Sequence, residues 1–433
     1  MQVLRARCAG LDVHPDTVVA CGLLTALDGT VEKFHRTFGT VTAQLLQLLD
    51  WLQGLGVSEA AMESTGAYWK PVWNVLEGQM TLLLANAHHL KTVPGRKTDV
   101  GDAEWIADLH RHGLLRGSFV PAKPQRELRE RVRHRGGYIE RVAQVKNELQ
   151  EALESANIKL GRVVKDIAGV SAWEMLEGLL AGQAPAEALA ELARGRRRSK
   201  KPQLAQALQG RMESPPRLIV SQLLGDLSWC EEQIEDVSAE IARRLASEAE
   251  VIERLDQVPG INRRVAEVIV AEAGTNMKQF PSVGHFIAWA GFCPGNNQSG
   301  GKRRAARTRP GDRTLKQALV EAANGASRKK GSFYKARYHR LAARRGRKRA
   351  LVAVGRGLLV CAYHMMARGT TYAEVGEDYY ERRHPEGLAR KLVRRIEKLG
   401  FQVQVQGLPP VLGGSEAKLK LCKAESKAPA ATC

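Results

Sequence analysis

The sequence has few aromatic residues and no closely spaced cysteines. Phe, Trp and Tyr make up only 5% of its 433 residues. The seven cysteines stand singly, at positions 8, 21, 230, 293, 361, 422 and 433. An odd number of scattered cysteines without a CxxC pair argues against a disulfide framework and a zinc ribbon. We therefore expect a reduced, cytoplasmic protein.

Long hydrophobic runs are lacking as well. No stretch reaches the roughly 18 apolar residues that a membrane helix needs. The closest candidate, LVAVGRGLLVC, is short and contains Arg356. The amino-terminal MQVLRARCAGLDVH has no apolar core of the kind found in signal peptides. The sequence therefore predicts that the protein has no membrane partner.

Positive charge, in contrast, is in excess. The formal net charge is +20, and residues 301–350 contain 18 Lys and Arg but only 2 acids. Residues 1–102 contain 8 basic and 10 acidic residues. A solvated basic helix face is the alternative, but so dense a stretch would repel itself without a polyanion, of which nucleic acid is the foremost. The candidate nucleic-acid contacts are Lys302, Arg303, Arg304, Arg307, Arg344, Arg345 and Arg347.

The first 122 residues have the pattern of an α/β domain. Strands are expected at 9–14, 17–24, 30–38, 59–63 and 80–87. Helices are expected at 42–56, 64–78 and 99–113, with Ser64, Thr65 and Asp99 as candidate caps. Strands that alternate with helices predict a sheet covered by helices.

The rest of the chain is predicted to be mainly α-helical. Residues 123–250 are interpreted as a coiled-coil-like helical spacer with an insertion at about 158–215, although a plain helical bundle fits equally well. Residues 251–400 form a basic domain that begins with VPGINRRVAEVIV. A Pro-Gly turn before a helix is typical of a helix-hairpin-helix, with Asn262 where a second glycine is common. The tail, 401–433, is predicted to be partly disordered.

Four acidic residues in the first domain stand where a carboxylate needs an explanation. Asp12 lies inside the apolar GLDVH, and Glu63 ends the apolar AAME. Asp99 and Asp102 open a predicted helix. Each has a plain alternative: a turn, a strand-end charge or a helix cap. Together, acids at strand ends and a helix start are typical of a ribonuclease-H-like sheet that holds two Mg²⁺ or Mn²⁺ ions against a phosphodiester.

GNNQSGGKRR contains a second candidate for chemistry. Ser299 is followed by Gly300 and Gly301 and then by basic residues. A flexible polar loop is the usual meaning of such a run. A serine nucleophile for phosphoryl transfer needs an exposed hydroxyl, little bulk beside it and cations for the phosphate charge. Spacing alone identifies no base for this serine and leaves both interpretations open.

Several motifs, in this order, resemble one family. GLDVH, MESTGAYWKPV and KTDVGDAEWIADL lie in the first domain, and VPGINRRVAEVIVAE, FPSVGHFIAWAGFCPGNNQSGGK and KRALVAVGRGLLV lie in the last. Their combination resembles the DEDD-type insertion-sequence transposases of the insertion-sequence-110 family, which are bridge-RNA-guided DNA recombinases. The matching stretches span most of residues 8–122 and 250–370. The insertion in the spacer and the tail match no motif of the family.

The resemblance implies a fold, a chemistry and partners. It implies a RuvC-like domain in which Asp12, Glu63, Asp99 and Asp102 bind Mg²⁺ or Mn²⁺. It implies that Ser299 forms a covalent intermediate with the DNA of a mobile element, in a site shared between protomers of a dimer or tetramer, and that a guide RNA binds. Two alternatives remain: a metal-dependent Holliday-junction resolvase or nuclease without serine chemistry, and a non-catalytic nucleic-acid-binding scaffold.

Overall fold

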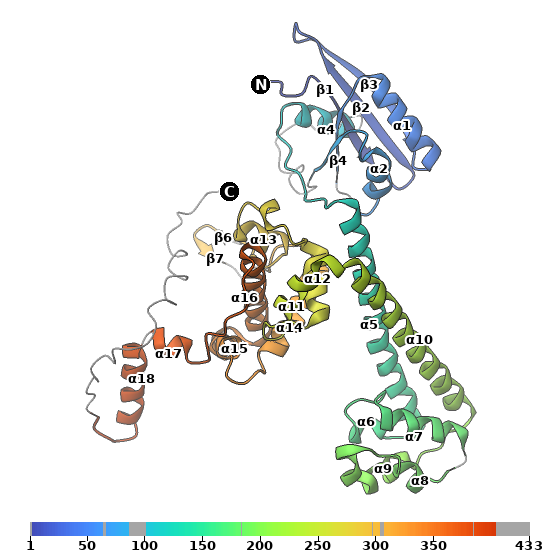
Figure 1. Ribbon diagram of the computed structural model, residues 1–433, viewed down its shortest axis with the longest axis vertical. Helices are drawn as coiled ribbons and strands as arrows, with labels where there is room; N and C mark the ends of the chain where they lie inside the picture. Colours follow the sequence, from blue (N-terminus) through green and yellow to red (C-terminus); the bar gives the residue numbers. More distant parts are fainter. Residues whose placement is uncertain are drawn as a thin grey trace. The chain divides into compact units, whose positions relative to one another are not determined.

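The chain forms two compact units, residues 1–123 and 124–433 (Figure 1). The computed structural model describes residues 2–63, 66–85, 101–182, 184–296, 298–303, 307–383 and 385–403, without the side chains of residues 298, 299 and 303. Of the predicted site residues, Asp99 and Arg304 lie outside the described residues. The tail predicted to be partly disordered also lies outside them, apart from residues 401–403.

A five-stranded mixed sheet forms the centre of the first unit. Its strands are β1 (Arg7–Val13), β2 (Thr17–Thr25), β3 (Val31–Gly39), β4 (Glu59–Glu63) and β5 (Thr81–Ala85), in the order β3-β2-β1-β4-β5. β1 pairs antiparallel with β2, and β2 with β3, whereas β1, β4 and β5 run parallel. The predicted sheet is confirmed, and its topology is consistent with a ribonuclease-H-like domain.

Helices cover both faces of this sheet (Figure 1). α1 (Thr42–Gly54) and α2 (Trp69–Leu76) pack on one face, in a buried core that includes Leu11 and Met62. α4 (Asp102–Arg111) packs on the other face, where Ala107 lies in a second cluster with Cys8. Burial on both faces explains why β1 is apolar along most of its length.

The starts of two helices differ from the predictions. α2 begins at Trp69, later than predicted, and its candidate caps Ser64 and Thr65 lie outside the described residues. The N-cap of α4 is Gly101, which makes no side-chain capping bond. The prediction that Asp99 caps this helix is therefore wrong, because the helix begins two residues later than a cap at Asp99 would allow.

Two long antiparallel helices begin the second unit. They are α5 (Lys123–Ser155) and α10 (Ser214–Arg244). Arg131 lies 3.5 Å from Glu240, and Arg141, further along α5, lies 3.0 Å from Asp226, which comes earlier in α10. Between them the chain forms α6 (Leu160–Val163), α7 (Val170–Ala181), α8 (Ala186–Ala190) and α9 (Lys201–Leu208). Buried leucines of these short helices share one core with α5 and α10.

Buried ion pairs join α5 to α12 (Arg263–Ala273), a helix that follows α10. Glu267 and Glu272 of α12 are only 4% and 0% exposed. Arg135 donates to Glu267 over 2.6 Å, and Arg133 donates to Glu272 through two nitrogens at 2.8 Å each. An unpaired buried charge is costly, so these bonds fix α12 in one position against α5.

Asn262, expected at the second-glycine position of the turn before α12, has a different role. Asn262 has an extended φ of −102° and caps the helix by accepting a hydrogen bond from Val265 N at 3.0 Å. Asn is a favoured N-cap residue, so it stands here as a cap and not as a substitute for glycine. The positive φ of the turn, +87°, belongs to Gly260, which packs on the carbonyl oxygen of Ala322.

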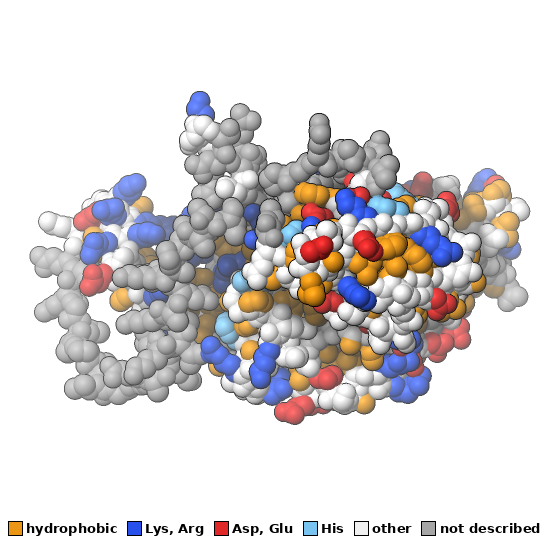
Figure 2. Space-filling view, turned by 90° about the horizontal axis from the view of Figure 1, so that it is seen from above, with side chains coloured by type: hydrophobic (Ala, Val, Ile, Leu, Met, Phe, Trp, Pro, Cys, Tyr) orange, Lys and Arg blue, Asp and Glu red, His pale blue; other side chains and the backbone are white. Residues whose placement is uncertain are grey.

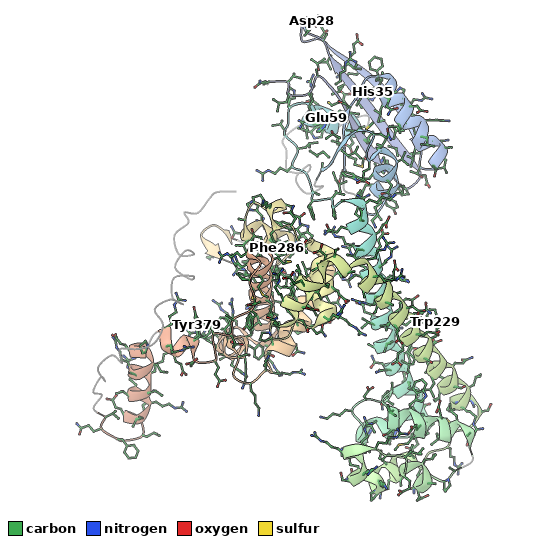
Figure 3. The ribbon with its side chains drawn as sticks, in the orientation of Figure 1. Asp28, His35, Glu59, Trp229, Phe286 and Tyr379 are labelled. Carbon is green, nitrogen blue, oxygen red and sulfur yellow. The ribbon has the colours of Figure 1, made fainter. Side chains whose placement is uncertain are left out.

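The remaining elements form the basic part of the second unit. They are α11 (Ala249–Asp256), α13 (Val283–Trp289), β6 (Gln298–Ser299), β7 (Lys302–Arg303), α14 (Arg313–Ala326), α15 (Phe333–Arg345), α16 (Arg347–Arg368), α17 (Tyr379–Arg383) and α18 (Pro385–Glu397). Short 3₁₀ helices lie at Gly195–Lys200, Ala246–Glu248 and Met277–Gln279. α16 contacts α13, α14 and α15, and Phe286 of α13 lies in this core beside Tyr363 (Figure 3). The prediction of a mainly helical region is confirmed.

α16 is, within the described residues, the one helix long and apolar enough to cross a membrane by length and composition. No uninterrupted apolar run in the sequence is long enough to cross a membrane, but α16 reaches the required length because its apolar residues are interrupted by only a few polar ones. Core helices have the same composition. In α16, Ala350, Val354, Leu358 and Ala362 are buried at a spacing of four residues, which is the pattern of a helix packed on neighbouring helices.

Candidate functional site

Two of the four predicted acids lie on neighbouring parallel strands. Asp12 is the second-last residue of β1, and Glu63 is the last residue of β4. The register pairs Leu11 with Met62, so Asp12 and Glu63 follow at the same level of the sheet. Because successive side chains alternate, both acids point away from the core under α1 and α2, toward the face that α4 covers.

The third acid begins the helix on that face. Asp102 is the first residue of α4, and the next residue, Ala103, packs directly on Gly10. A Cβ atom at Gly10 would lie 2.1 Å from the carbonyl oxygen of Ala103, so only glycine allows this approach. Gly10 is two residues before Asp12 and shares its face of the strand. The fold thus brings Asp12, Glu63 and Asp102 to one face of the sheet.

The donors on this face suit a hard divalent cation. Carboxylate oxygens are the ligands that Mg²⁺ and Mn²⁺ prefer. The Asp12 side chain is 19% exposed, so its carboxylate is accessible from solvent. Within the described residues, no three His, Cys, Asp or Glu side chains are grouped closely enough to hold an ion. Since Asp99 lies outside those residues, the described acids provide suitable donors without completing a set of ligands.

His14 is a neighbour of the acids that the sequence prediction did not include. Its Nε2 lies 3.1 Å from Oδ2 of Asp12. The motif GLDVH contained the signal, because residues two apart in an extended chain project to the same side. A hydrogen bond between His14 and Asp12 would occupy one oxygen of this carboxylate.

Ser299 lies in a short β-hairpin and not in an irregular loop. β6 and β7 pair antiparallel, with Ser299 opposite Lys302. Gly300 and Gly301 form the turn between them, with φ of +55° and +74°. Positive φ at both turn positions is typical of type I′ hairpins and strongly favours glycine. The turn therefore explains the two glycines and places Ser299 next to the tip of the hairpin.

The base of this hairpin is tied to the helices around it. The amide of Gly295 donates to the carbonyl of Arg307 over 2.9 Å, which extends the pairing of the two arms. Asp312 then caps α14 by accepting from Leu315 N at 2.8 Å. Its other carboxylate oxygen accepts from Arg133 of α5 at 3.2 Å. The same arginine that holds Glu272 of α12 thus also holds the residue at which the hairpin joins α14.

The predicted phosphate contacts are exposed where the structure describes them. This holds for Lys302, Arg307, Arg344, Arg345 and Arg347, whereas Arg304 and the side chain of Arg303 are not described. The ion pairs formed within the described residues involve none of these five cations. Figure 2 shows acidic, basic and hydrophobic side chains mixed on the face that it draws. The composition of residues 301–350 is far more one-sided, with 18 basic residues and 2 acids. Exposed cations that form no ion pair within the described residues are suited to bind phosphate.

Two family models match the chain. Residues 9–158 match the DEDD transposase model of IS110 elements, which is described as a transposase, and residues 252–339 match the Transposase IS116/IS110/IS902 family. Together these matches cover more than half of the chain. The chain belongs to the IS110 transposase family.

A curated relative has a related name. A protein of Pseudomonas aeruginosa strain PAO1, "Probable family 20 transposase", is 26% identical over 288 residues, which are 65% of this chain and 75% of the relative. The family predicted from the motifs is confirmed, and the chain is a DNA transposase. The first matched region includes the acids of the sheet, and the second includes the serine hairpin. The DEDD type of this transposase family implies that the activity depends on a divalent metal.

Proposed function

We propose that this IS110 transposase cleaves and exchanges the DNA strands of its mobile element with two sets of groups. The first is the carboxylates of Asp12, Glu63, Asp99 and Asp102, and the second is the hydroxyl of Ser299. The observation that carries the proposal is that Asp12, Glu63 and Asp102 share one face of the sheet, at adjacent strand ends and a helix start. The glycine turn beside Ser299 supports the second part.

In this proposal the acids hold Mg²⁺ or Mn²⁺. Metal ions held by these carboxylates would supply activation of an attacking oxygen and stabilisation of a leaving oxygen. The residues of this chain orient the carboxylates: the β1–β4 register sets Asp12 beside Glu63, and the contact of α4 with Gly10 sets the height of Asp102 above the sheet. Asp12, Glu63 and Asp102 therefore depend on buried backbone for their positions.

The hydroxyl of Ser299 is the second set of groups in the proposal, and it attacks the phosphodiester. Its oxygen forms a bond to phosphorus while the bond from phosphorus to the leaving sugar oxygen breaks, and the serine proton is released to that oxygen through solvent. Lys302, opposite Ser299 in the hairpin, is placed to offset the phosphate charge. The flexible polar loop, the competing interpretation, does not account for paired strands on both sides of the turn.

The partners belong to the proposal as well. The acids lie in one compact unit and the serine in the other. We infer that the working site combines the acids of one protomer with the serine of another, in a homodimer or homotetramer on DNA, with a guide RNA that selects the target. The exposed cations from Lys302 to Arg347 contact the phosphates of these nucleic acids.

Covalent trapping on DNA tests this function. Ser299→Ala should bind DNA as the wild type does but give no protein–DNA band on a denaturing gel, while Ser58→Ala, at an exposed serine before β4, should keep the band. Asp12→Asn should abolish cleavage, and Asp50→Asn, exposed on α1, should not.

Two results would favour the alternatives. An intact covalent band in Ser299→Ala, together with loss of cleavage in Asp12→Asn, would indicate a metal-dependent nuclease or resolvase. Full function of Asp12→Asn would indicate a non-catalytic scaffold.

A further inference from the structure

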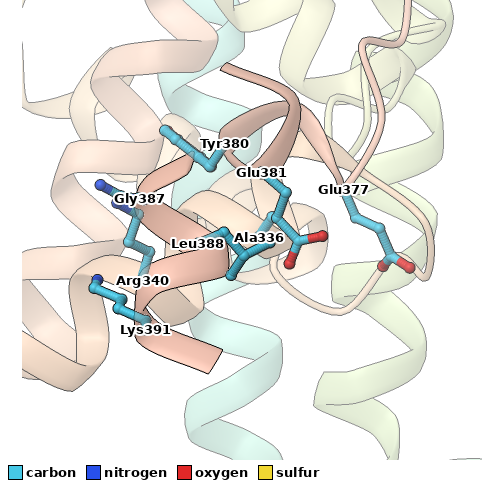
Figure 4. A pocket seen from close by; sticks show the side chains of 8 residues that line it. All are labelled: Ala336, Arg340, Glu377, Tyr380, Glu381, Gly387, Leu388 and Lys391. Atoms are coloured by element: carbon cyan, nitrogen blue, oxygen red, sulfur yellow. The ribbon is translucent and has the colours of Figure 1, made fainter. Parts of the chain in front are cut away.

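A groove between α15 and the carboxy-terminal helices takes no part in the site described above (Figure 4). Its lining includes Arg340 of α15, Glu377, Tyr380 and Glu381 in and before α17, and Lys391 of α18. Its volume is about 330 Å³, at the small end of the range for ligand sites. It is therefore large enough for one nucleotide but not for a duplex.

Tyr380 and Arg340, which line the groove, interact with each other, and the Tyr380 ring also stacks on Phe333. The rings of Phe333 and Tyr380 lie 5.7 Å apart and within 20° of parallel. The guanidinium carbon of Arg340 lies 4.7 Å from the centre of the Tyr380 ring. Arg340 is exposed, whereas both rings are half-buried. Aromatic rings and guanidinium planes are the surfaces on which unpaired bases stack, and both the exposed Arg340 and the half-buried Tyr380 line the groove.

The two sides of the groove carry opposite charges. Figure 4 shows the cationic ends of Arg340 and Lys391 on one side and the carboxylates of Glu381 and Glu377 on the other. Among the described residues, none of these four forms an ion pair, although the neighbouring Asp378 is paired with Arg382 at 2.8 Å. The groove thus offers two cations and two carboxylates that form no ion pair within the described part of the protein, although Arg340 also lies over the Tyr380 ring.

A nucleotide complements this pattern. Its phosphate pairs with cations, its base stacks on a planar group, and an amino group on the base donates to a carboxylate. We propose that the groove binds one unpaired nucleotide of a single-stranded nucleic acid, with its base against Arg340 and Tyr380, its phosphate on Lys391 and the amino group of an adenine, cytosine or guanine on Glu381. The choice of a nucleic-acid ligand rests on the function proposed above.

Binding of single strands to the full chain without divalent metal tests the proposal. The probes are fluorescent oligonucleotides of about twelve nucleotides, oligo-C and oligo-U as RNA and oligo-C and oligo-T as DNA. Cytosine has an amino group where uracil and thymine have a carbonyl, so we expect oligo-C to bind about fivefold more tightly. A preference within the RNA pair, the DNA pair or both supports the proposal and identifies the source of the nucleotide.

Single substitutions then distinguish binding in the groove from general electrostatic attraction to the basic surface. Lys391→Ala and Arg340→Ala should weaken oligo-C binding by roughly fivefold to tenfold. Arg395→Ala, an exposed position on the same helix that does not line the groove, removes the same charge and should change the affinity by less than about twofold. Glu381→Gln should remove the preference for cytosine, because its amide can also donate to the carbonyl of uracil.

Equal losses in Lys391→Ala and Arg395→Ala would overturn the proposal, since they would show attraction to the helix as a whole. Equal binding of oligo-C and its uracil or thymine counterpart by the wild type would overturn it as well. Lys391 is exposed, so its substitution leaves the fold intact and the comparison valid. Because no cleavage is measured, a failure here is distinct from a failure of the serine and metal chemistry, which covalent trapping reports.

Discussion

The two units place their candidate catalytic groups in opposite ways. In the first unit, Asp12 and Glu63 alternate with Leu11 and Met62, both of them 0% exposed, in a sheet covered on both faces. In the second, Ser299 stands beside a glycine turn at which an added Cβ would meet no atom within 4 Å. A metal site needs carboxylates at fixed separations, which packing provides, whereas a nucleophile needs room for the DNA that it attacks.

The largest expected effect is on the packed side of this comparison. Asp102→Asn keeps the shape of the side chain but removes a negative charge from the proposed metal site. We expect DNA cleavage to fall by roughly a thousandfold or more. Glu104→Gln is the matched control, because Glu104 lies in the same helical turn but pairs with Lys33 at 2.6 Å. Cleavage assayed across Mg²⁺ concentrations checks the prediction, and full activity of Asp102→Asn would contradict it.

The second unit uses buried charge where the first uses apolar contact. Arg135→Leu removes the partner at 2.6 Å of the buried Glu267 and leaves that carboxylate with the mostly exposed Arg263. We expect the second unit to lose about 3 kcal/mol of unfolding free energy. Arg141→Leu breaks an exposed pair with Asp226 and should cost less than about 1 kcal/mol. Urea unfolding measures both, and equal effects would show that the buried pair contributes nothing special.

Gly10 tests the apolar packing of the first unit in a similar way. The Cβ of Gly10→Ala would lie 2.1 Å from one backbone atom of α4 and 2.4 Å from another, so the helix must move away from β1. We expect a loss of about 1–3 kcal/mol in unfolding free energy. Because Asp102 begins that helix, cleavage should fall as well.

The matched control is Gly54→Ala near the end of α1, where an added Cβ meets nothing within 4 Å. It should leave unfolding and cleavage nearly unchanged. If Gly10→Ala retained both stability and cleavage, the contact between β1 and α4 would not be what positions Asp102.

A buried histidine makes the first unit sensitive to acid. His110 of α4 is 2% exposed, and burial, with a smaller contribution from Arg5, lowers its pKa from 6.5 to about 4. The unfolded chain therefore binds a proton that the folded chain does not, and stability falls as the pH drops from about 6.5 to about 4. At pH 5 the loss is about 2 kcal/mol relative to pH 7. Urea unfolding at both pH values should show a smaller loss for His110→Gln.

The sequence was most informative where periodicity is strong. The apolar run around Asp12 and the exact five residues of EAAME both predicted strands that the structure contains. The pairing of β1 with β4 followed only from the three-dimensional register, since no local pattern states which strands are neighbours. The close contact at Gly10 was equally hidden, because a glycine in a strand does not reveal which helix will pack on it.

The sequence was least informative about turns and caps. Asp is a favoured residue type at the N-cap, so Asp99 was a candidate. The N-cap of α4 is instead Gly101. The run around Ser299 has the composition of a flexible loop, but two consecutive glycines between residues able to pair also suit a type I′ hairpin. Local composition allows both outcomes in each case, and the surrounding backbone contacts decide between them.

The smallest expected effect concerns the hairpin turn. A substitution there should change the reaction of Ser299 with DNA but not the global stability of the protein. Gly300 has a φ of +55°, which β-branched residues rarely adopt, so Gly300→Val should shift the turn and with it Ser299. The turn is exposed, and a Cβ added at Gly300 would meet no described atom within 4 Å, so global stability should stay within about 0.5 kcal/mol. We expect covalent adduct formation to fall by roughly tenfold, the rate cost of about 1.4 kcal/mol of strain. Gly300→Asn, which accepts the left-handed conformation more readily, should retain most of the adduct. If the valine and asparagine variants formed the same amount of adduct, the turn would not position Ser299. The contrast between acids fixed by packing and a serine placed by a glycine turn would then be unsupported.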